Sequence, residues 1–171
     1  RTAYFQVPEN PDRWFWNVSW WSDPAILGAY PEDGLRLYGQ YLPKGYEKDL
    51  PVICQKLDYY AQNIYNGFYV KAGERGPEVV PTPPGFPKTG IGWPVTPECL
   101  YWGPKFLCER YKLPLIIAEN GMSDLDNPSL DGGVHDAARI NFLHRYIREF
   151  RRAAEDGVPV AGYFHWSFLD N

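Results

Sequence analysis

The sequence contains few of the residues that bind metal ions or form disulfides. It has three Cys and three His among 171 residues. The number of Cys is odd and no two of them form a C-x-x-C pair, which argues against both a disulfide framework and a zinc site. The His residues do not have metal-ligand spacing either. The sequence therefore predicts no metal site.

Several other binding classes also lack their usual signals. No apolar run approaches the roughly 18 residues of a membrane-spanning helix, so we expect no membrane partner. The 17 Lys and Arg are scattered and the net charge is -4, which excludes a basic stripe for nucleic acid. No G-x-G-x-x-G follows a predicted strand, so a dinucleotide-binding fold lacks support. We expect no cofactor.

Both ends of the sequence look cut. The N-terminus begins at Arg1, without an initiator Met or a signal-peptide pattern. The sequence stops at Asn171, directly after an apolar, strand-like run. We therefore expect a piece of a larger protein, and the localisation stays open, with the cytoplasm slightly favoured.

Aromatic residues are abundant, at 17% of the sequence with 7 Trp and 13 Tyr. They could form a core rich in Tyr and Trp, which composition alone favours. They could also form a sugar-binding surface, because flat apolar rings stack on the C–H faces of pyranoses.

Predicted strands and helices alternate through most of the chain. The first 32 residues are rich in Trp and Pro and are predicted to be irregular, with room for short helical pieces, and short helices are predicted at 33–42 and 47–56. Strands are then predicted at 57–65, 113–119 and 158–168, with helices at 97–111 and 135–155. The run 113–119 is almost entirely apolar, which is typical of a buried parallel strand. The order predicts a parallel α/β fold.

The loops favour one α/β architecture. The longest, 66–95, has about 30 residues rich in Pro and Gly, and loops of that length are usually functional or disordered. The long loops follow strands, as they do on the active-site face of a (β/α)8 barrel. A whole TIM barrel needs roughly 200 or more residues and eight strands, and this chain supplies three to four. We therefore predict that residues 1–171 form the C-terminal portion of a catalytic (β/α)8 TIM-barrel domain.

Both long helices have predicted boundaries. Thr96 is predicted to be the N-cap of the first helix, with Pro97 at its first position. The dipeptide Asp156-Gly157 is predicted to end the second helix. The predicted buried stripe of that second helix comprises Ile140, Leu143, Ile147, Phe150 and Ala154.

One carboxylate ends the buried strand at 113–119. Strand alternation places Glu119 on the same face as Leu115 and Ile117. In a barrel, this position would bring Glu119 to the mouth. The alternative is a Glu that points to solvent or caps the next turn.

The sequence around Glu119 resembles that of a known protein family. The segment 117–121 (Ile-Ala-Glu-Asn-Gly) is similar to the nucleophile motif of family 1 glycoside hydrolases, the β-glucosidase family. The segment 162–171 resembles the family's signature near the last barrel strand, and 63–65 (Asn-Ile-Tyr) resembles its Asn-x-Tyr motif. The likeness covers nearly the whole chain, and its further matches include 13–15, 23–24, 92–93 and 134–136.

The resemblance implies a retaining β-glycosidase that hydrolyses terminal β-linked sugars by double displacement. Glu119 would attack the anomeric carbon, and Tyr65 would donate a hydrogen bond that orients it. Asn63 would touch sugar hydroxyls. Trp166 would lie under the sugar being cleaved, and Trp93 would lie at the pocket mouth against the aglycone. Ordinary core or loop packing is the alternative for the three aromatic residues.

Retaining hydrolysis also needs a second carboxyl group, roughly 5 Å from the first. In this family the acid/base Glu lies in an Asn-Glu-Pro motif, and the sequence contains none. The resemblance therefore implies that the isolated chain is inactive and requires the N-terminal half of the barrel as its partner. Two alternatives stay open: a sugar-binding relative that has lost catalysis, and a thioglucosidase-like enzyme.

Overall fold

The computed structural model describes residues 18–74 and 76–169 as two compact units. The helical unit comprises residues 18–58 and the described part of 72–78, and the sheet unit comprises 59–71 and 79–169. The motif at 13–15, most of the predicted irregular region 1–32 and the last two residues of the motif 162–171 lie outside the described residues.

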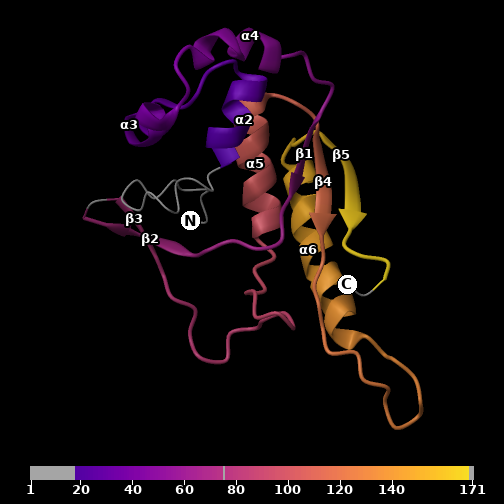
Figure 1. Ribbon diagram of the computed structural model, residues 1–171. Helices are drawn as coiled ribbons and strands as arrows, with labels where there is room; N and C mark the ends of the chain where they lie inside the picture. The colour runs from indigo at the N-terminus through magenta and orange to yellow at the C-terminus, as the bar shows by residue number, and fades with distance from the viewer. Residues whose placement is uncertain (1–17, 75, 170–171) are drawn as a thin grey trace. The chain divides into compact units, whose positions relative to one another are not determined.

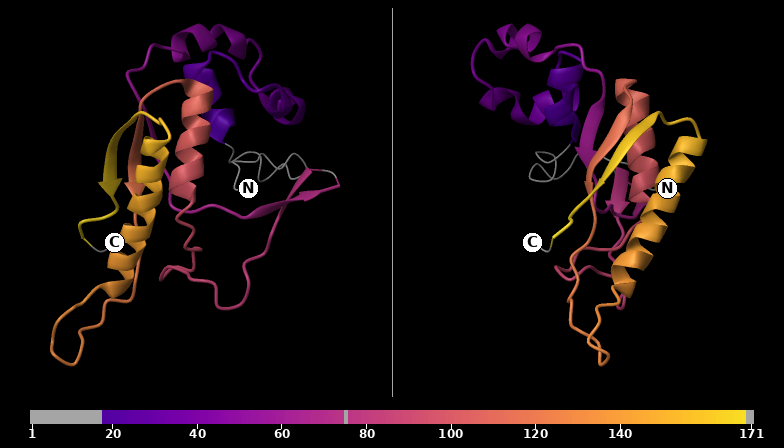
Figure 2. Two further views of the ribbon diagram at one scale, coloured as in Figure 1. Left: turned by 180° about the vertical axis from the view of Figure 1, so that it is seen from behind. Right: turned by 90° about the vertical axis from the view of Figure 1, so that its right-hand side faces the viewer.

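The sheet unit is built on three parallel strands. They are β1 (Tyr60–Asn63), β4 (Leu115–Asn120) and β5 (Val160–His165), in the order β1-β4-β5. Helix α5 (Cys99–Tyr111) connects β1 to β4, and helix α6 (Ala137–Glu155) connects β4 to β5. Both helices cover the same face of the sheet (Figures 1 and 2). The predicted parallel α/β arrangement is confirmed, although β1 and β5 are shorter than predicted.

The helix-covered face of the sheet holds the core. Leu115 and Ile117 of β4 are fully buried there. Val160 of β5 packs against a cluster that includes Ala153 of α6, and the ring of Tyr60 lies 5.1 Å from that of Tyr111 in α5. Apolar burial on this face therefore fixes both helices to the sheet.

The opposite face of the sheet is open within the sheet unit. Ile116 and Gly162 are paired across β4 and β5 and lie on this face, and the neighbouring Phe164 is 62% exposed. No described helix of the sheet unit covers this side (Figure 2).

Helix α6 buries a different stripe from the predicted one. Ile140 and Ile147 are exposed, so the predicted stripe is wrong at these positions. The rings of Phe142 and Tyr146 stack instead, with centroids 3.8 Å apart. Apolar residues occur on both sides of this helix, and packing of the aromatic side selects its orientation. Its buried residues are Phe142, Tyr146, Glu149, Phe150 and Ala153.

Helix α5 begins later than predicted. Its N-cap is Glu98, so the assignment of Thr96 as N-cap is wrong. The Thr96 hydroxyl instead accepts a hydrogen bond from the backbone N–H of Gly67 at 2.8 Å. The backbone N–H of Thr96 donates to the Tyr146 hydroxyl at 2.8 Å. Thr96 thus connects the loop after β1 to helix α6. At the end of α6, Asp156 is the C-cap and Gly157 adopts a positive φ, as predicted.

The segment 66–95 was predicted to lack regular structure, but it contains a two-stranded sheet. Strand β2 (Val70–Gly73) pairs with β3 (Gly76–Val79). The pairing extends to Tyr69, whose carbonyl accepts from the Val80 N–H. The Pro-rich sequence did not predict this hairpin, because Pro lacks the backbone N–H donor and is depleted in strands.

The helical unit consists of short helices around an aromatic cluster. The ring of Trp20 lies 4.6 Å from that of Tyr30 and 5.5 Å from that of Tyr38. In the part of the chain that the structure describes, no helix has the length and apolar content to cross a membrane. The elements are α2 (Val18–Ile26), α3 (Glu32–Tyr38), η1 (Gly39–Tyr41), η2 (Tyr46–Lys48) and α4 (Leu50–Ile53).

Asn120 joins the carboxyl ends of all three parallel strands. Its side chain is 0% exposed. The amide nitrogen donates to the Ile64 carbonyl at 2.8 Å, and the amide oxygen accepts from the Tyr163 hydroxyl at 2.8 Å. Buried polar groups of this kind are costly when they lose their partners.

We expect Asn120→Ala to lower the free energy of unfolding of the chain by about 2–3 kcal/mol, because it leaves the Ile64 carbonyl and the Tyr163 hydroxyl without this partner. Urea denaturation followed by circular dichroism measures the change. Asn141→Ala, at an exposed position of α6, is the matched control and should leave the midpoint nearly unchanged. Equal midpoints for the two variants would contradict this role of Asn120.

Candidate active site

An irregularity at the end of β4 sets the direction of the Glu119 side chain. Ile117 pairs with Tyr163 and Asn120 pairs with His165, so three steps along β4 match two along β5. Such a bulge shifts the alternation of side chains by one residue. The buried positions are accordingly Leu115, Ile117 and Asn120. The prediction that Glu119 shares a face with Leu115 and Ile117 is wrong, because the bulge turns Glu119 toward the open face.

Glu119 is bound by a tyrosine from the neighbouring strand. Tyr65 follows β1, and its hydroxyl donates to Oε2 of Glu119 at 2.7 Å. Burial, and then the hydrogen bond and negative charge of Glu119, raise the pKa of Tyr65 well above its ordinary value. The phenol therefore stays protonated and remains a donor. The ring of Trp93 packs edge-on against Tyr65, with centroids 5.3 Å apart.

A pocket of about 740 Å³ opens at the carboxyl ends of the strands. Glu119, Tyr65, Trp93 and Trp166 all line it, so the structure brings together four of the five predicted site residues. The fifth, Asn63, pairs with Glu119 across β1 and β4 but is exposed and is not among the lining residues. The roles of these residues in binding and catalysis stay predictions.

Gly121 lets β4 and Trp166 approach closely. The backbone N–H of Trp166 donates to the Asn120 carbonyl at 2.9 Å. A Cβ atom at position 121 would clash with the Trp166 carbonyl oxygen. Only glycine fits here, and the approach holds the Trp166 backbone against the end of β4, in the pocket that Glu119 also lines.

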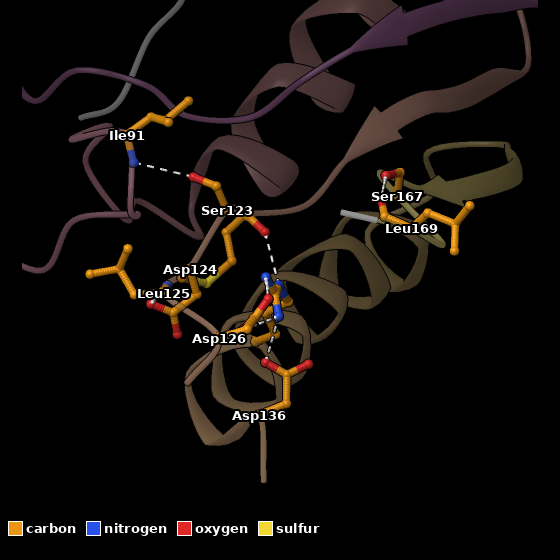
Figure 3. A network of polar contacts seen from close by, with 10 residues as sticks. Ile91, Ser123, Asp124, Leu125, Asp126, Asp136, Ser167 and Leu169 are labelled. Carbon is orange, nitrogen blue, oxygen red and sulfur yellow. Dashed lines mark hydrogen bonds and ion pairs between the residues drawn. The ribbon is translucent and has the colours of Figure 1, made fainter. Parts of the chain in front are cut away.

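Two loops form a wall of the pocket that the sequence did not predict. We call the residues 89–93 the upper loop and the residues 121–127 the lower loop. The N–H of Gly90 donates to the Ser123 carbonyl at 2.8 Å, and the N–H of Ile91 donates to the Ser123 hydroxyl at 3.2 Å (Figure 3). Both loops contribute residues to the pocket lining. Their contact depends on tertiary structure, so sequence patterns give no sign of it.

Arg139, in the first turn of α6, holds the lower loop. Its guanidinium donates to both carboxylate oxygens of Asp126 at 2.7 Å, and also binds Asp136 at 2.9 Å and the Met122 carbonyl at 3.2 Å (Figure 3). The hydrogen bonds to Asp126, followed by the charges of Asp136 and Asp126, raise the pKa of Arg139. The side chain is 14% exposed and lines the pocket. The spacing of Asp136 and Arg139, three residues apart at a helix start, is the one signal visible in the sequence.

The candidate site contains a carboxylate, and the described residues hold no candidate metal centre. Among residues 18–74 and 76–169, no group of three or more His, Cys, Asp or Glu could hold a metal ion. What the pocket offers is an oriented carboxylate, Glu119, in a lining that also includes the rings of Trp93 and Trp166. These groups suit covalent chemistry on a polar ligand with flat apolar faces.

The fold and the site together define the class of this protein. It is a partial (β/α)8 barrel whose candidate active site lies at the carboxyl ends of the strands. Residues 7–171 match Glycosyl hydrolase family 1. The chain belongs to this family, and the resemblance seen in its motifs is confirmed.

Similar proteins have the same fold. The chain is 40% identical over 159 residues to a 1,4-beta-D-glucan glucohydrolase of Thermotoga neapolitana, covering 92% of this chain and 37% of the relative. It is also 40% identical to Beta-glucosidase A of Thermotoga maritima, covering 92% of this chain and 36% of the relative. The structure of the Thermotoga maritima β-glucosidase in complex with noeuromycin superposes with a TM-score of 0.80 at 38% identity, covering 91% of this chain and 35% of that one. The chain thus spans little more than a third of these relatives.

We expect Glu119→Gln to lower the pKa of Tyr65, because the substitution removes the negative charge that disfavours a phenolate. The pKa should still exceed the ordinary value of about 10, since burial is the largest cause of the shift. Titration of tyrosines labelled with 13C at Cζ, followed by NMR, measures it. Tyr65→Phe identifies the signal, and an unchanged titration in Glu119→Gln would contradict the contact.

Proposed function

We propose that this chain carries the nucleophile side of the active site of a retaining β-glucosidase. The observation that carries the proposal is the hydrogen bond from Tyr65 to Glu119, made in a pocket at the carboxyl end of β4. The names of the relatives, a glucan glucohydrolase and a β-glucosidase, support a β-glucoside as the substrate.

The reaction proceeds in two displacements. In the first, a carboxylate oxygen of Glu119 bonds to the anomeric carbon as the bond to the leaving oxygen breaks, which gives a glycosyl-enzyme. In the second, water attacks the same carbon and releases Glu119, so the configuration is retained overall. Because Tyr65 binds Oε2, it restricts rotation of the carboxylate and leaves the other oxygen for the sugar.

The aromatic side chains bind the two parts of the substrate. Trp166 and Trp93 are both partly exposed and both line the pocket, so the ring of Trp166 is accessible to the sugar being cleaved and the ring of Trp93 is accessible to the aglycone. Asn63 contributes a hydrogen bond to a sugar hydroxyl only if its side chain turns into the pocket when the sugar binds, because it is not among the lining residues.

A second carboxyl group must protonate the leaving oxygen and later accept a proton from water. The family's acid/base motif, Asn-Glu-Pro, does not occur in this chain. The chain spans about 37% of its relative from Thermotoga neapolitana, and we place the acid in the part of the barrel that it does not span. The isolated chain is therefore inactive.

The test uses a chimera, in which this chain replaces the matching segment of Thermotoga maritima Beta-glucosidase A. We expect the chimera to hydrolyse an aryl β-glucoside and the isolated chain to be inactive. Glu119→Ala in the chimera should lower kcat by roughly 10⁴-fold or more, because the covalent route is lost. With azide added, this variant should form the α-glucosyl azide, since azide attacks from the face that Glu119 occupied.

Glu155→Ala, at an exposed site on α6, is the matched control and should retain the activity of the chimera. Turnover by the isolated chain, or a kcat of the Glu119→Ala chimera without azide close to that of the unmodified chimera, would contradict the proposal. A folded chimera that binds glucose but does not hydrolyse glucosides would instead favour the sugar-binding alternative.

A further inference from the structure

Tyr65, the hydrogen-bond donor to Glu119, lies beyond the last residue of β1, so strand pairing alone does not fix its position. We propose that Thr96 is a positioning residue for Tyr65, and that it acts by holding the backbone at Gly67. The inference rests on the proposed function, because Tyr65 affects the reaction only through Glu119.

The backbone is first held on the β1 side of Tyr65. The N–H of Ile64 donates to the Glu119 carbonyl at 3.0 Å, and the Ile64 carbonyl accepts from the Asn120 amide at 2.8 Å. These two hydrogen bonds attach the residue before Tyr65 to the end of β4. Residues 64–69 belong to no helix or strand, so a second attachment is required to stop the chain from pivoting about the first.

The second attachment follows Tyr65 closely. The N–H of Gly67 donates to the Thr96 hydroxyl at 2.8 Å, and only Asn66 lies between Gly67 and Tyr65. Gly67 also lies against the first turn of α5, where a Cβ added to it would be 3.5 Å from the Cβ of Cys99. A side chain whose backbone is held on both sides keeps a defined direction, which a site for chemistry requires.

Thr96 is itself fixed on all of its polar groups. Besides the bond between its hydroxyl and Gly67, its N–H donates to the Tyr146 hydroxyl at 2.8 Å, and its carbonyl accepts from the Cys99 N–H at 3.1 Å. Thr96 is 4% exposed and Tyr146 is 0% exposed, so the loss of either partner leaves a buried polar group unpaired. Thr96 thereby transfers the position of α6 to the backbone beside Tyr65.

The segment that ends at Thr96 also contacts the ring of Tyr65. Trp93, three residues before Thr96, packs edge-on against this ring with centroids 5.3 Å apart. Between the two, the N–H of Val95 donates to the Pro87 carbonyl at 2.9 Å. The segment 93–96 therefore supports Tyr65 at its ring and, through Thr96, at its backbone.

The consequence for the reaction follows from the short hydrogen bond between Tyr65 and Glu119. That bond, 2.7 Å long, weakens when the phenol is displaced, and Glu119 then rotates more freely. A poorly oriented nucleophile slows the first displacement, whereas the aromatic groups that bind the substrate stay in place. Loss of the Thr96 hydroxyl should therefore lower kcat and affect KM little.

The experiment uses the chimera described above, after loss of its activity in Glu119→Ala has been established. Thr96→Val keeps the shape of the side chain and removes the hydroxyl, whereas Thr96→Ser keeps the hydroxyl. Thr82→Val is the matched control, at an exposed position that does not line the pocket. The substrate is phenyl β-D-glucoside, whose poor leaving group makes the first displacement limit kcat, and the absence of a phenol burst verifies this.

We expect Thr96→Val to lower kcat by about 10-fold with a KM within about 2-fold of the unmodified value, since orientation is lost and binding is kept. Thr96→Ser should recover most of this loss, and Thr82→Val should change neither quantity.

A double-mutant cycle shows whether Thr96 acts through Tyr65. The double variant Tyr65→Phe/Thr96→Val should have the same kcat as Tyr65→Phe alone, because the contact that Thr96 positions is already absent. A structural role independent of Tyr65 would instead multiply the two losses.

The same contact can be measured without activity, by NMR titration of Tyr65 in the chain. The hydrogen bond to Glu119 is one of the causes that raise the pKa of Tyr65, so Thr96→Val should lower this pKa. Thr96→Ser should leave it nearly unchanged.

An unchanged kcat in Thr96→Val, an equal loss in Thr96→Ser, or losses that multiply in the cycle would overturn the inference. If Thr96→Val does not fold, Tyr146→Phe takes its place, because it removes the hydroxyl that accepts from the Thr96 N–H. It should give a lower kcat that is likewise absent in the Tyr65→Phe background, and any other result would overturn the inference. Failure of the proposed function is distinct, since the unmodified chimera would then not hydrolyse glucosides.

Discussion

The bulge at the end of β4 is the constraint on which the rest of the site depends. One extra residue between Ile117 and Asn120 puts Asn120 on the helix-covered face and Glu119 on the open one. With regular alternation the two would exchange places, and a carboxylate would be buried beneath α6. The bulge therefore gives two adjacent polar residues different surroundings, since Asn120 is buried and Glu119 lines the pocket. Asn120 stabilises the bulge through Ile64 and Tyr163.

The pocket gains its shape from contacts between loops that follow different strands. Tyr65 follows β1, the lower loop follows β4, and Trp166 follows β5. Each strand end contributes one part, because parallel strands present their carboxyl ends at the same edge of the sheet. The lower loop is held in position by hydrogen bonds outside the sheet, at Ser123 and Arg139 (Figure 3).

The sequence predicted the parts of the structure that depend on local patterns. An apolar run identified β4, and the family resemblance of separate motifs named Glu119, Tyr65, Trp93 and Trp166, all of which line one pocket. The sequence failed where the tertiary structure decides. It could not choose between the two apolar sides of α6, and it gave no sign that an extra residue would reverse the face of Glu119. The pairing of the upper and lower loops is likewise a long-range contact without a local pattern.

The contact between Tyr65 and Glu119, the proposed nucleophile, forms without any group covering the open face of the sheet. Glu119 and Tyr65 take their positions from β1, β4 and β5, and the helices behind these strands are packed on the covered face alone. The nucleophile side therefore needs no group on the open face for its geometry. Phe164 and its neighbours on that face, however, leave apolar surface in water, which costs free energy until another sheet or a further set of strands covers it. We infer that the remainder of a family 1 barrel covers this face and brings the second carboxyl group to Glu119, so that the burial of apolar surface and the completion of the active site are one event.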